Sequence, residues 1–290
     1  MKSREYFAPK SVAEAISLLS RYGEKAKVVS GGSDFLMQLK RKVAEPECFI
    51  SLGGIPDLDF IAYDERDGLR IGSLTTLDRL ANSSVIRSKF AVLTQAASML
   101  GTPAIRNQAT LGGNLCNAAP SADTAPPLLA LAAKVKITGV DGERVVPIED
   151  LFIGPGLTIL RNNDILTEIL VPNLEPHSGG AYLKEKRRQG ADLAVVGVAA
   201  LVVMEGEILK DARIALGAVA PTPVRARKAE EILKGQRFSQ RLAEEAGQSA
   251  SDESNPIDDL RGSADYRRNL VAVLTKRALA QAVQEQREVR

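Results

Sequence analysis

Two short glycine-containing segments hold the residues of this chain that are best suited to chemistry. The first is Ser30-Gly31-Gly32-Ser33-Asp34, and the second is Thr110-Leu111-Gly112-Gly113-Asn114. Each comes where an apolar, strand-like run ends and the backbone must turn. Glycine reaches φ > 0 easily and lets main-chain N–H groups approach a ligand without a Cβ in the way. Two such turns, flanked by hydroxyl, amide and carboxylate side chains, predict a cradle for a diphosphate.

The first segment lies between a predicted strand at 27–29 and a predicted helix at 35–42, which Ser33 or Asp34 would cap. This geometry offers free N–H groups and the positive end of a helix to an anion. The segment lacks the G-x-G-x-x-G fingerprint, so an ordinary Rossmann nicotinamide site is not indicated. The alternative is a tight strand-to-helix turn that requires only backbone freedom.

The second segment belongs to a longer stretch, residues 101–127, that is rich in small and amide residues and poor in large apolar ones. Such a stretch inside a compact domain is typical of a binding loop. Asp123 is suited to accept hydrogen bonds from ribityl or ribose hydroxyls, while Asn114 and Thr110 can donate to phosphate. Alternatively, Asp123 caps the helix that follows. The convergence of so many polar residues favours the binding role.

The composition of the chain limits which partners and cellular locations are expected. The chain has 290 residues, of which 44% are hydrophobic and 26% are charged, and its net charge is +2. That balance gives no electrostatic reason to expect nucleic acid or an anionic membrane as a partner, and no apolar run approaches the roughly 20 residues that span a bilayer. No apolar run follows the first residues, so a signal peptide is not expected.

Few side chains are available for catalysis or metal binding. Two cysteines, Cys48 and Cys116, are too few for a disulfide framework or for a zinc or iron–sulfur site. The single histidine, His177, lies in a predicted loop at 177–180, and no Ser or Cys motif accompanies it. We therefore expect a reducing cytoplasm, no metal and no catalytic residue, with His177 more suited to a linker than to a catalytic base.

Hydrophobic periodicity predicts an α+β protein in three parts, with boundaries at 1–56, 57–176 and 177–290. The first part is predicted to be a small β-α-β-α-β unit with parallel strands. It includes a capped helix that begins at Ser11 and ends at Gly23, and strands at 27–29 and 48–52.

The second part is predicted to be a mixture of hairpins and helices. Its elements are hairpins at 60–63 with 69–72 and at 134–138 with 144–147, helices at 77–100 (broken near 83–84) and 125–133, and a strand at 164–171. The third part is predicted to be a three-stranded antiparallel sheet with helices. Its strands are expected at 181–186, 193–204 and 211–219, its helices at 225–233, 239–246 and 265–285, and a polar, mobile segment at 247–255.

The sequence resembles the FAD-binding medium subunit of molybdenum hydroxylases, the group of xanthine dehydrogenase, aldehyde oxidase and carbon monoxide dehydrogenase. The resemblance covers essentially the whole chain. Residues 28–35 resemble the first flavin motif, with Ser33 where Thr is more usual, residues 110–114 the second, and residues 121–126 the acidic stretch behind it. It implies a small N-terminal α/β domain and a middle α+β domain with FAD held between them, followed by the antiparallel sheet domain.

The same resemblance implies a set of FAD-binding residues. They are Val28, Val29, Ser30, Gly31, Gly32, Ser33, Asp34, Phe35, Leu100, Thr110, Gly112, Gly113, Asn114, Cys116, Asp123, Leu166 and Lys184. Leu166 is expected near the isoalloxazine. Lys184 is expected to reach the flavin, where a cation stabilises the anion of the reduced ring; alternatively it is a surface lysine. Arg188 and Asp192 also fit the pattern, or form a structural ion pair.

The function implied is that of an electron-transfer subunit. A molybdopterin large subunit would oxidise the substrate, a 2Fe-2S small subunit would carry electrons to this FAD, and NAD, a quinone or dioxygen would receive them. The related hydroxybenzoyl-CoA reductase flavin subunit carries an inserted iron–sulfur segment with four cysteines, which this chain lacks. The alternatives are a free-standing flavin-dependent reductase or oxidase, and a non-catalytic nucleotide-binding assembly module.

Overall fold

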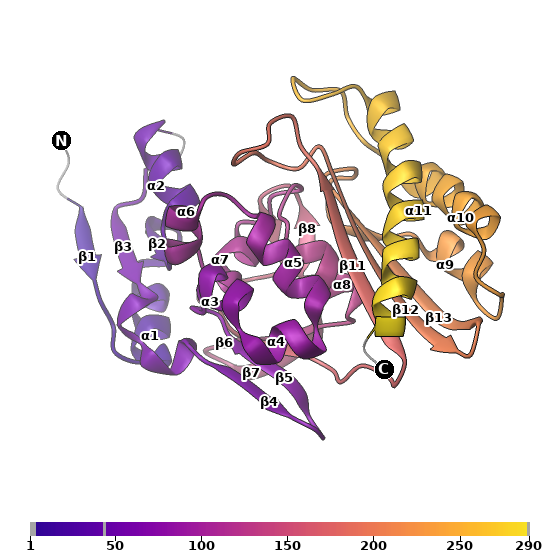
Figure 1. Cartoon of the computed structure of the whole chain (residues 1–290). Helices are drawn as coiled ribbons and strands as arrows, with labels where there is room; N and C mark the ends of the chain where they lie inside the picture. Colours follow the sequence, from indigo (N-terminus) through magenta and orange to yellow (C-terminus); the bar gives the residue numbers. More distant parts are fainter. Residues whose placement is uncertain (1–3, 43–44, 289–290) are drawn as a thin grey trace.

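The computed structural model describes residues 4–42 and 45–288, and the three larger sheets of this part follow one another along the molecule (Figure 1). The first sheet has the order β1-β3-β2 and is parallel, as predicted. Its strands are β1 (Glu5–Phe7), β2 (Ala26–Val29) and β3 (Cys48–Ser51), and its helices are α1 (Val12–Tyr22) and α2 (Ser33–Lys40). The predicted cap of α1 is present, because Ser11 Oγ accepts a hydrogen bond from the Glu14 amide at 3.2 Å.

The middle sheet is antiparallel, in the order β4-β5-β10-β6-β7. Its strands are β4 (Ile61–Asp64), β5 (Gly68–Gly72), β6 (Lys134–Gly139), β7 (Gly142–Pro147) and β10 (Ile165–Val171). The helices beside it are α3 (Leu77–Asn82), α4 (Ser84–Lys89), α5 (Ala91–Met99), α6 (Pro103–Gln108), α7 (Leu111–Cys116) and α8 (Ala125–Ala130). The predicted break near 83–84 is confirmed, and a second, unpredicted break occurs at Phe90, which is buried in the core.

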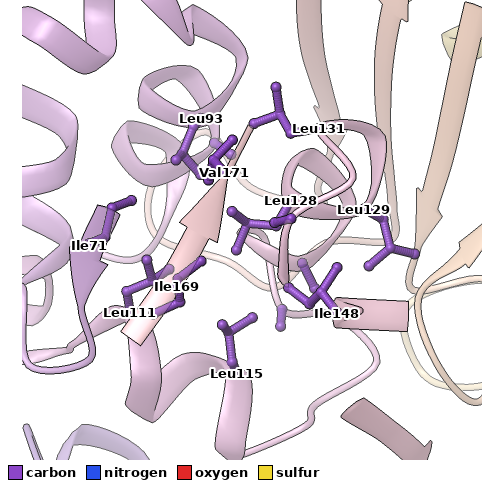
Figure 2. Close-up of a cluster of buried hydrophobic side chains, with 14 of the residues drawn as sticks. Ile71, Leu93, Leu111, Leu115, Leu128, Leu129, Leu131, Ile148, Ile169 and Val171 are labelled. Carbon is purple, nitrogen blue, oxygen red and sulfur yellow. The ribbon is translucent and has the colours of Figure 1, made fainter. Parts of the chain in front are cut away.

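Strand β10 forms the centre of the middle core. Ile169 and Val171 project from it among the side chains of Ile71, Leu93 and Leu111 (Figure 2). This cluster accounts for the apolar residues on that face of the strand, whereas Glu168 of the same strand pairs with Arg70 and Lys136 of the neighbouring strands.

The long stretch at 101–127 is not the irregular loop that its composition predicts. It contains α6, α7 and the start of α8. Thr102 and Thr110 act as N-caps, accepting hydrogen bonds from the amides of Ile105 and Gly113 at 3.3 and 3.1 Å. Two local caps therefore allow short helices to form where large apolar anchors are scarce.

The third sheet has the order β11-β12-β13-β14, so a short fourth strand joins the three that were predicted. Its strands are β11 (Ser178–Glu185), β12 (Val196–Glu205), β13 (Ile208–Gly217) and β14 (Val224–Arg225), and the helices are α9 (Arg227–Leu233), α10 (Gln240–Glu253) and α11 (Ala264–Glu288). The described residues also form a two-stranded pair, β8 (Phe152–Gly154) with β9 (Leu157–Thr158). Their 3-10 turns are η1 (Gly23–Lys25), η2 (Leu52–Gly54), η3 (Pro56–Leu58) and η4 (Ile148–Leu151).

Strand β12 is buried on both faces. Ala199 and Leu201 belong to the middle core, whereas Val198 and Val202 pack against the core beneath α10 and α11. Because successive side chains of a strand point to opposite faces, one apolar strand joins the two cores.

Two predictions for this region are wrong. Residues 178–180 form the start of β11 rather than a loop, and residues 247–253 belong to α10 rather than to a mobile segment. Both corrections follow from α11. A Cβ on Gly179 would lie 2.1 Å from the Ala282 oxygen of α11, and one on Gly247 would lie 2.5 Å from the Ala272 oxygen. These glycines permit close backbone packing, which the sequence shows only as turn-like composition.

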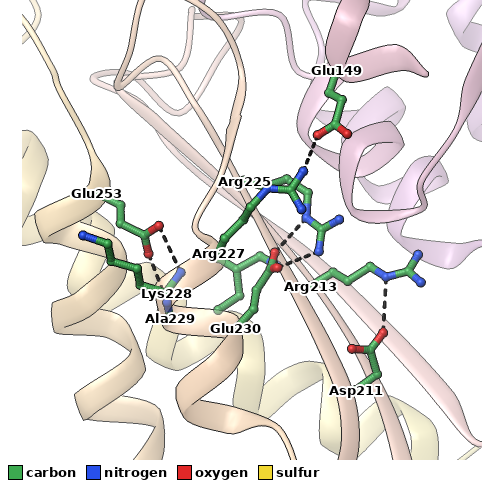
Figure 3. Close-up of polar contacts among 10 residues, drawn as sticks. Glu149, Asp211, Arg213, Arg225, Arg227, Lys228, Ala229, Glu230 and Glu253 are labelled. Atoms are coloured by element: carbon green, nitrogen blue, oxygen red, sulfur yellow. Dashed lines mark hydrogen bonds and ion pairs between the residues drawn. The ribbon is translucent and has the colours of Figure 1, made fainter. Parts of the chain in front are cut away.

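Helix α9 is held by carboxylates from two directions (Figure 3). Glu253 of α10 accepts hydrogen bonds from the amides of Lys228 and Ala229 at 3.1 and 3.0 Å, in place of a local cap. Glu230 accepts the Ile214 amide of β13 at 2.9 Å and pairs with Arg225 at 2.6 Å.

Candidate functional site

The two glycine segments lie against each other, although 80 residues separate their contacting side chains. Thr110 Oγ1 donates a hydrogen bond to Ser30 Oγ at 3.1 Å. A Cβ on Gly31 would lie 1.8 Å from the Gln108 oxygen, and one on Gly113 would lie 2.7 Å from Ser30 Oγ. The glycines are therefore required, first of all, by the close approach of one segment to the other.

Helix α7 is positioned by backbone hydrogen bonds to the segment that follows β5. The Leu111 amide donates to the Thr75 oxygen and the Gly112 amide to the Ser73 oxygen, each at 2.9 Å. A Cβ on Gly112 would lie 2.6 Å from that of Ser73. The second glycine pair thus anchors α7 to the middle sheet, and three amides of its first turn, including that of Gly113, are already bonded within the chain.

The first segment, in contrast, offers free donors. No acceptor in the described part of the chain takes a hydrogen bond from the amides of residues 31–34. Gly32 adopts φ +73° as the N-cap residue of α2, and neither Ser33 nor Asp34 caps the helix. The predicted cap is therefore wrong, and the first-turn amides of α2 remain available to an anion.

Two side chains add further donors to this cradle. Ser30 Oγ accepts from Thr110, so its own hydrogen is free to be donated. Asn114 Oδ1 accepts from Thr124 Oγ1 at 2.6 Å, and no acceptor within the described residues takes its Nδ2 hydrogens. The two segments consequently offer different kinds of donor. The first supplies backbone amides, whereas the second supplies the side chain of Asn114 and holds Ser30 in place.

Asp123 lies in a buried group of three polar side chains. Lys184 Nζ donates to one carboxylate oxygen at 2.7 Å and Tyr182 Oη to the other at 2.8 Å. The Lys184 and Asp123 side chains are only 1% and 5% exposed. Lys184 is thus not a surface lysine. Asp123 does not cap α8 either, since Thr124 is the N-cap residue and no side chain accepts a hydrogen bond from the first-turn amides of the helix.

The electrostatics of this group follow from its burial. Burial raises the pKa of Asp123, while Lys184 and the Tyr182 hydroxyl oppose that rise. Burial, together with the Asp123 charge, holds the pKa of Tyr182 well above its ordinary value, so the phenol stays protonated and donates. Sequence reasoning missed Tyr182. The available signal was its position two residues before Lys184 on one strand, which puts both on the same face.

The remaining residues predicted to bind FAD differ in how far their side chains are exposed. Leu166 is 3% exposed and lies on β10 beside a bulge, within the middle core. Phe35 of α2 packs edge-to-face on Phe49, with ring centroids 5.7 Å apart. Burial raises the pKa of the Cys116 thiol to about 12. Val28 and Val29 are half-buried on β2, Leu100 is half-buried after α5, and Asp34 is exposed.

Other residues with polar roles are structural in this geometry. Arg188 and Asp192 form an ion pair at 3.3 Å. His177 adopts φ +63°, and its carbonyl oxygen accepts the Met204 amide at 3.0 Å. Among residues 4–42 and 45–288 no group of three or more potential ligands is placed to hold a metal ion, and no helix there is long and apolar enough to cross a membrane.

Comparison with known proteins identifies the family of the chain. Residues 2–174 match the family described as the FAD binding domain in molybdopterin dehydrogenase, and residues 181–282 match the carbon monoxide dehydrogenase flavoprotein C-terminal domain. The chain is 35% identical to the carbon monoxide dehydrogenase medium chain of Hydrogenophaga pseudoflava, over 95% of both chains. It is 33% identical to the xanthine dehydrogenase FAD-binding subunit of Escherichia coli O157:H7, over 96% of this chain and 95% of that one.

A solved structure shares the fold throughout. It is the Hydrogenophaga pseudoflava carbon monoxide dehydrogenase that lacks the Mo-pyranopterin moiety of the molybdenum cofactor, with a TM-score of 0.94, 35% identity, and coverage of 98% of this chain and 99% of that one. The chain therefore belongs to the family of FAD-binding subunits of molybdenum-containing dehydrogenases, and FAD is its cofactor.

Proposed function

We propose that this chain is the electron-transfer subunit of a multi-subunit molybdenum hydroxylase. It would receive electrons from a 2Fe-2S partner subunit and pass them to NAD, a quinone or dioxygen, with FAD held between parts 1–56 and 57–176. The observation that carries the proposal is the row of unbonded amides at residues 31–34, beside the free donors of Ser30 and Asn114. A diphosphate is an acceptor-rich anion that such a cradle fits.

The residues present would divide the work of holding FAD. The α2 amides, Ser30 and Asn114 would bind the diphosphate, and Leu166 would support the ring system from within the middle core. Lys184, neutralised by Asp123 before binding, would be the one cation of this buried group. When bound, FAD supplies the reversible acceptance of two electrons, and the protein supplies position and electrostatics.

Partner subunits are supported by the relatives and by the surface. Similar proteins are named as medium chains or as FAD-binding subunits, which are parts of larger assemblies. None of the eight residues of α2 is buried, and Leu36 and Met37 are 58% and 47% exposed. Apolar side chains on a helix beside the cofactor cradle favour a surface that another chain or the cofactor covers. Free cysteines favour a reducing cytoplasm as its location.

The test compares dinucleotide with nucleoside binding. The apo chain is titrated with FAD and with riboflavin, and flavin fluorescence is followed. We expect FAD to bind at least about 100-fold more tightly, equivalent to about 2.7 kcal/mol, because two or three charge-assisted hydrogen bonds to the diphosphate are lost with riboflavin. Equal affinities would contradict a diphosphate cradle. Copurification with cluster-bearing and molybdenum-bearing chains separates this proposal from a free-standing flavin enzyme.

A further inference from the structure

A second concave site lies away from the glycine segments, where the middle part of the chain meets the third sheet. It is a cavity of about 180 Å³. Its walls are largely apolar and rigid, because four prolines line it: Pro120, Pro155, Pro221 and Pro256. None of the residues of 28–35 or 110–116 lines this cavity.

Two arginines and one carboxylate are the charged residues that line the cavity, beside the polar Ser121 and Asn255. The Asp259 carboxylate accepts hydrogen bonds from Arg267 Nη2 at 2.5 Å and from Arg261 Nε at 3.1 Å, so one negative charge is paired with two positive charges. The Arg267 side chain is only 3% exposed, and its Nε has no hydrogen-bond partner in the described structure. A buried donor without a partner is costly, and the group carries one unbalanced positive charge. The Nε has almost no accessible surface, so a monoanion in the cavity would balance the excess charge without contacting that atom.

The backbone around the cavity is strained and tightly held. Ala118 and Ala218 adopt φ +46° and +64°, a region that residues with a Cβ occupy at a cost. The Ala218 amide donates to the Pro120 oxygen at 2.7 Å, and its carbonyl accepts Arg267 Nη1 at 2.8 Å. One strained residue therefore links the proline wall to the buried arginine.

We propose that this cavity is a binding site for a small monocarboxylate with an apolar body. The carboxylate would lie against Arg261 and Arg267, and the apolar body against the prolines and Ile257. A volume of about 180 Å³ is about the volume that six water molecules occupy in the liquid, and this limits the ligand to roughly ten non-hydrogen atoms. Inorganic phosphate carries the charge but cannot use the apolar walls.

The experiment titrates benzoate into the full chain by isothermal calorimetry, with and without FAD. Benzamide tests the need for charge, and inorganic phosphate tests the need for an apolar body. We expect saturable benzoate binding, with benzamide and phosphate at least tenfold weaker. The absence of saturable binding at millimolar benzoate, or equal binding of benzamide, would overturn the proposal.

Two variants locate the site without removing the buried Arg267. Arg261→Gln, whose side chain is 34% exposed, should weaken benzoate at least tenfold. Ala220→Phe should fill the cavity and abolish binding. Arg237→Gln makes the same charge change at an exposed ion pair with Glu207 and should leave benzoate affinity unchanged. Unaltered affinity in both cavity variants would place the ligand elsewhere. The FAD content of each variant is measured separately, so this result does not depend on the flavin site.

Discussion

Removal of the Asp123 carboxylate should damage folding as well as flavin binding. From the sequence, Asp123→Ala would be expected to remove a polar ligand and little core. The structure changes that expectation, because Asp123 is the partner of a Lys184 side chain that is 1% exposed. The substitution leaves an ammonium and a phenol hydroxyl buried without their acceptor.

The magnitude can be estimated from the geometry. Breaking a buried ion pair by removing one partner costs about 3–5 kcal/mol. Stranding the Tyr182 hydroxyl adds about 1–3 kcal/mol, although the two terms overlap. Since domains are stable by roughly 5–15 kcal/mol, the variant should be severely destabilised. Asp123→Ala combined with Lys184→Met removes the stranded charge, so much of the lost stability should return.

Urea denaturation of the apo chain at neutral pH, followed by circular dichroism, measures these differences. The control is Asp141→Ala, which removes the same group from an exposed pair with Arg161 and should cost no more than about 1 kcal/mol. FAD titration of the double variant then separates folding from binding: a stable double variant that fails to bind FAD assigns the pair a direct role. If Asp123→Ala costs no more than Asp141→Ala, the buried-pair reasoning is refuted.

Three further predictions concern the supports of the fold and the site. Gly31→Ala should destabilise the chain by about 1–3 kcal/mol or more and lower its FAD content, because its Cβ would lie 1.8 Å from the Gln108 oxygen. The control is Gly53→Ala, whose Cβ would have its nearest neighbour at 3.7 Å, in the same thermal-melting and flavin-absorbance assays. Equal effects of the two substitutions would argue against the Gly31 contact. Glu230→Ala should cost about 3 kcal/mol in urea denaturation, because it strands the Ile214 amide and Arg225; a loss below 1 kcal/mol would contradict this. For Asp259, burial raises the pKa, but hydrogen bonds from the Arg261 amide and Arg267 outweigh it and lower the pKa from 3.8 to about 2. Because the pKa of Asp259 is lower in the folded than in the unfolded chain, its carboxylate stabilises the fold at pH values above the unfolded pKa. The difference in stability between wild type and Asp259→Asn should therefore be full above pH 4 and shrink as the pH falls toward 2. A difference that is constant over this range would oppose the assignment.

Local signals in the sequence were sufficient for most elements. Ser11 and Glu14 start α1, the Ser83 cap interrupts the long helix, and the alternation around Asp141-Gly142 gives the second hairpin. Each of these depends on residues within a few positions of one another, which is why sequence periodicity and capping chemistry predict them. The errors at 178–180 and 247–253 have the opposite origin, since α11 packs on both from a distant part of the chain.

In the candidate site, too, some features follow from local sequence and others from long-range packing. The sequence by itself determined that the chain holds two glycine turns with polar neighbours, too few metal ligands, and the motifs of an FAD-binding family. It did not determine which donors are free, because hydrogen bonds from α7 to Ser73 and Thr75 join segments that only the folded sheet brings together. Likewise, Asp123, Tyr182 and Lys184 become one neutralised group only when β11 packs beside α5 and α8 packs against β12 and β13 of the same sheet. Burial and long-range pairing are properties of the tertiary structure, and they decide which polar atoms remain for a ligand.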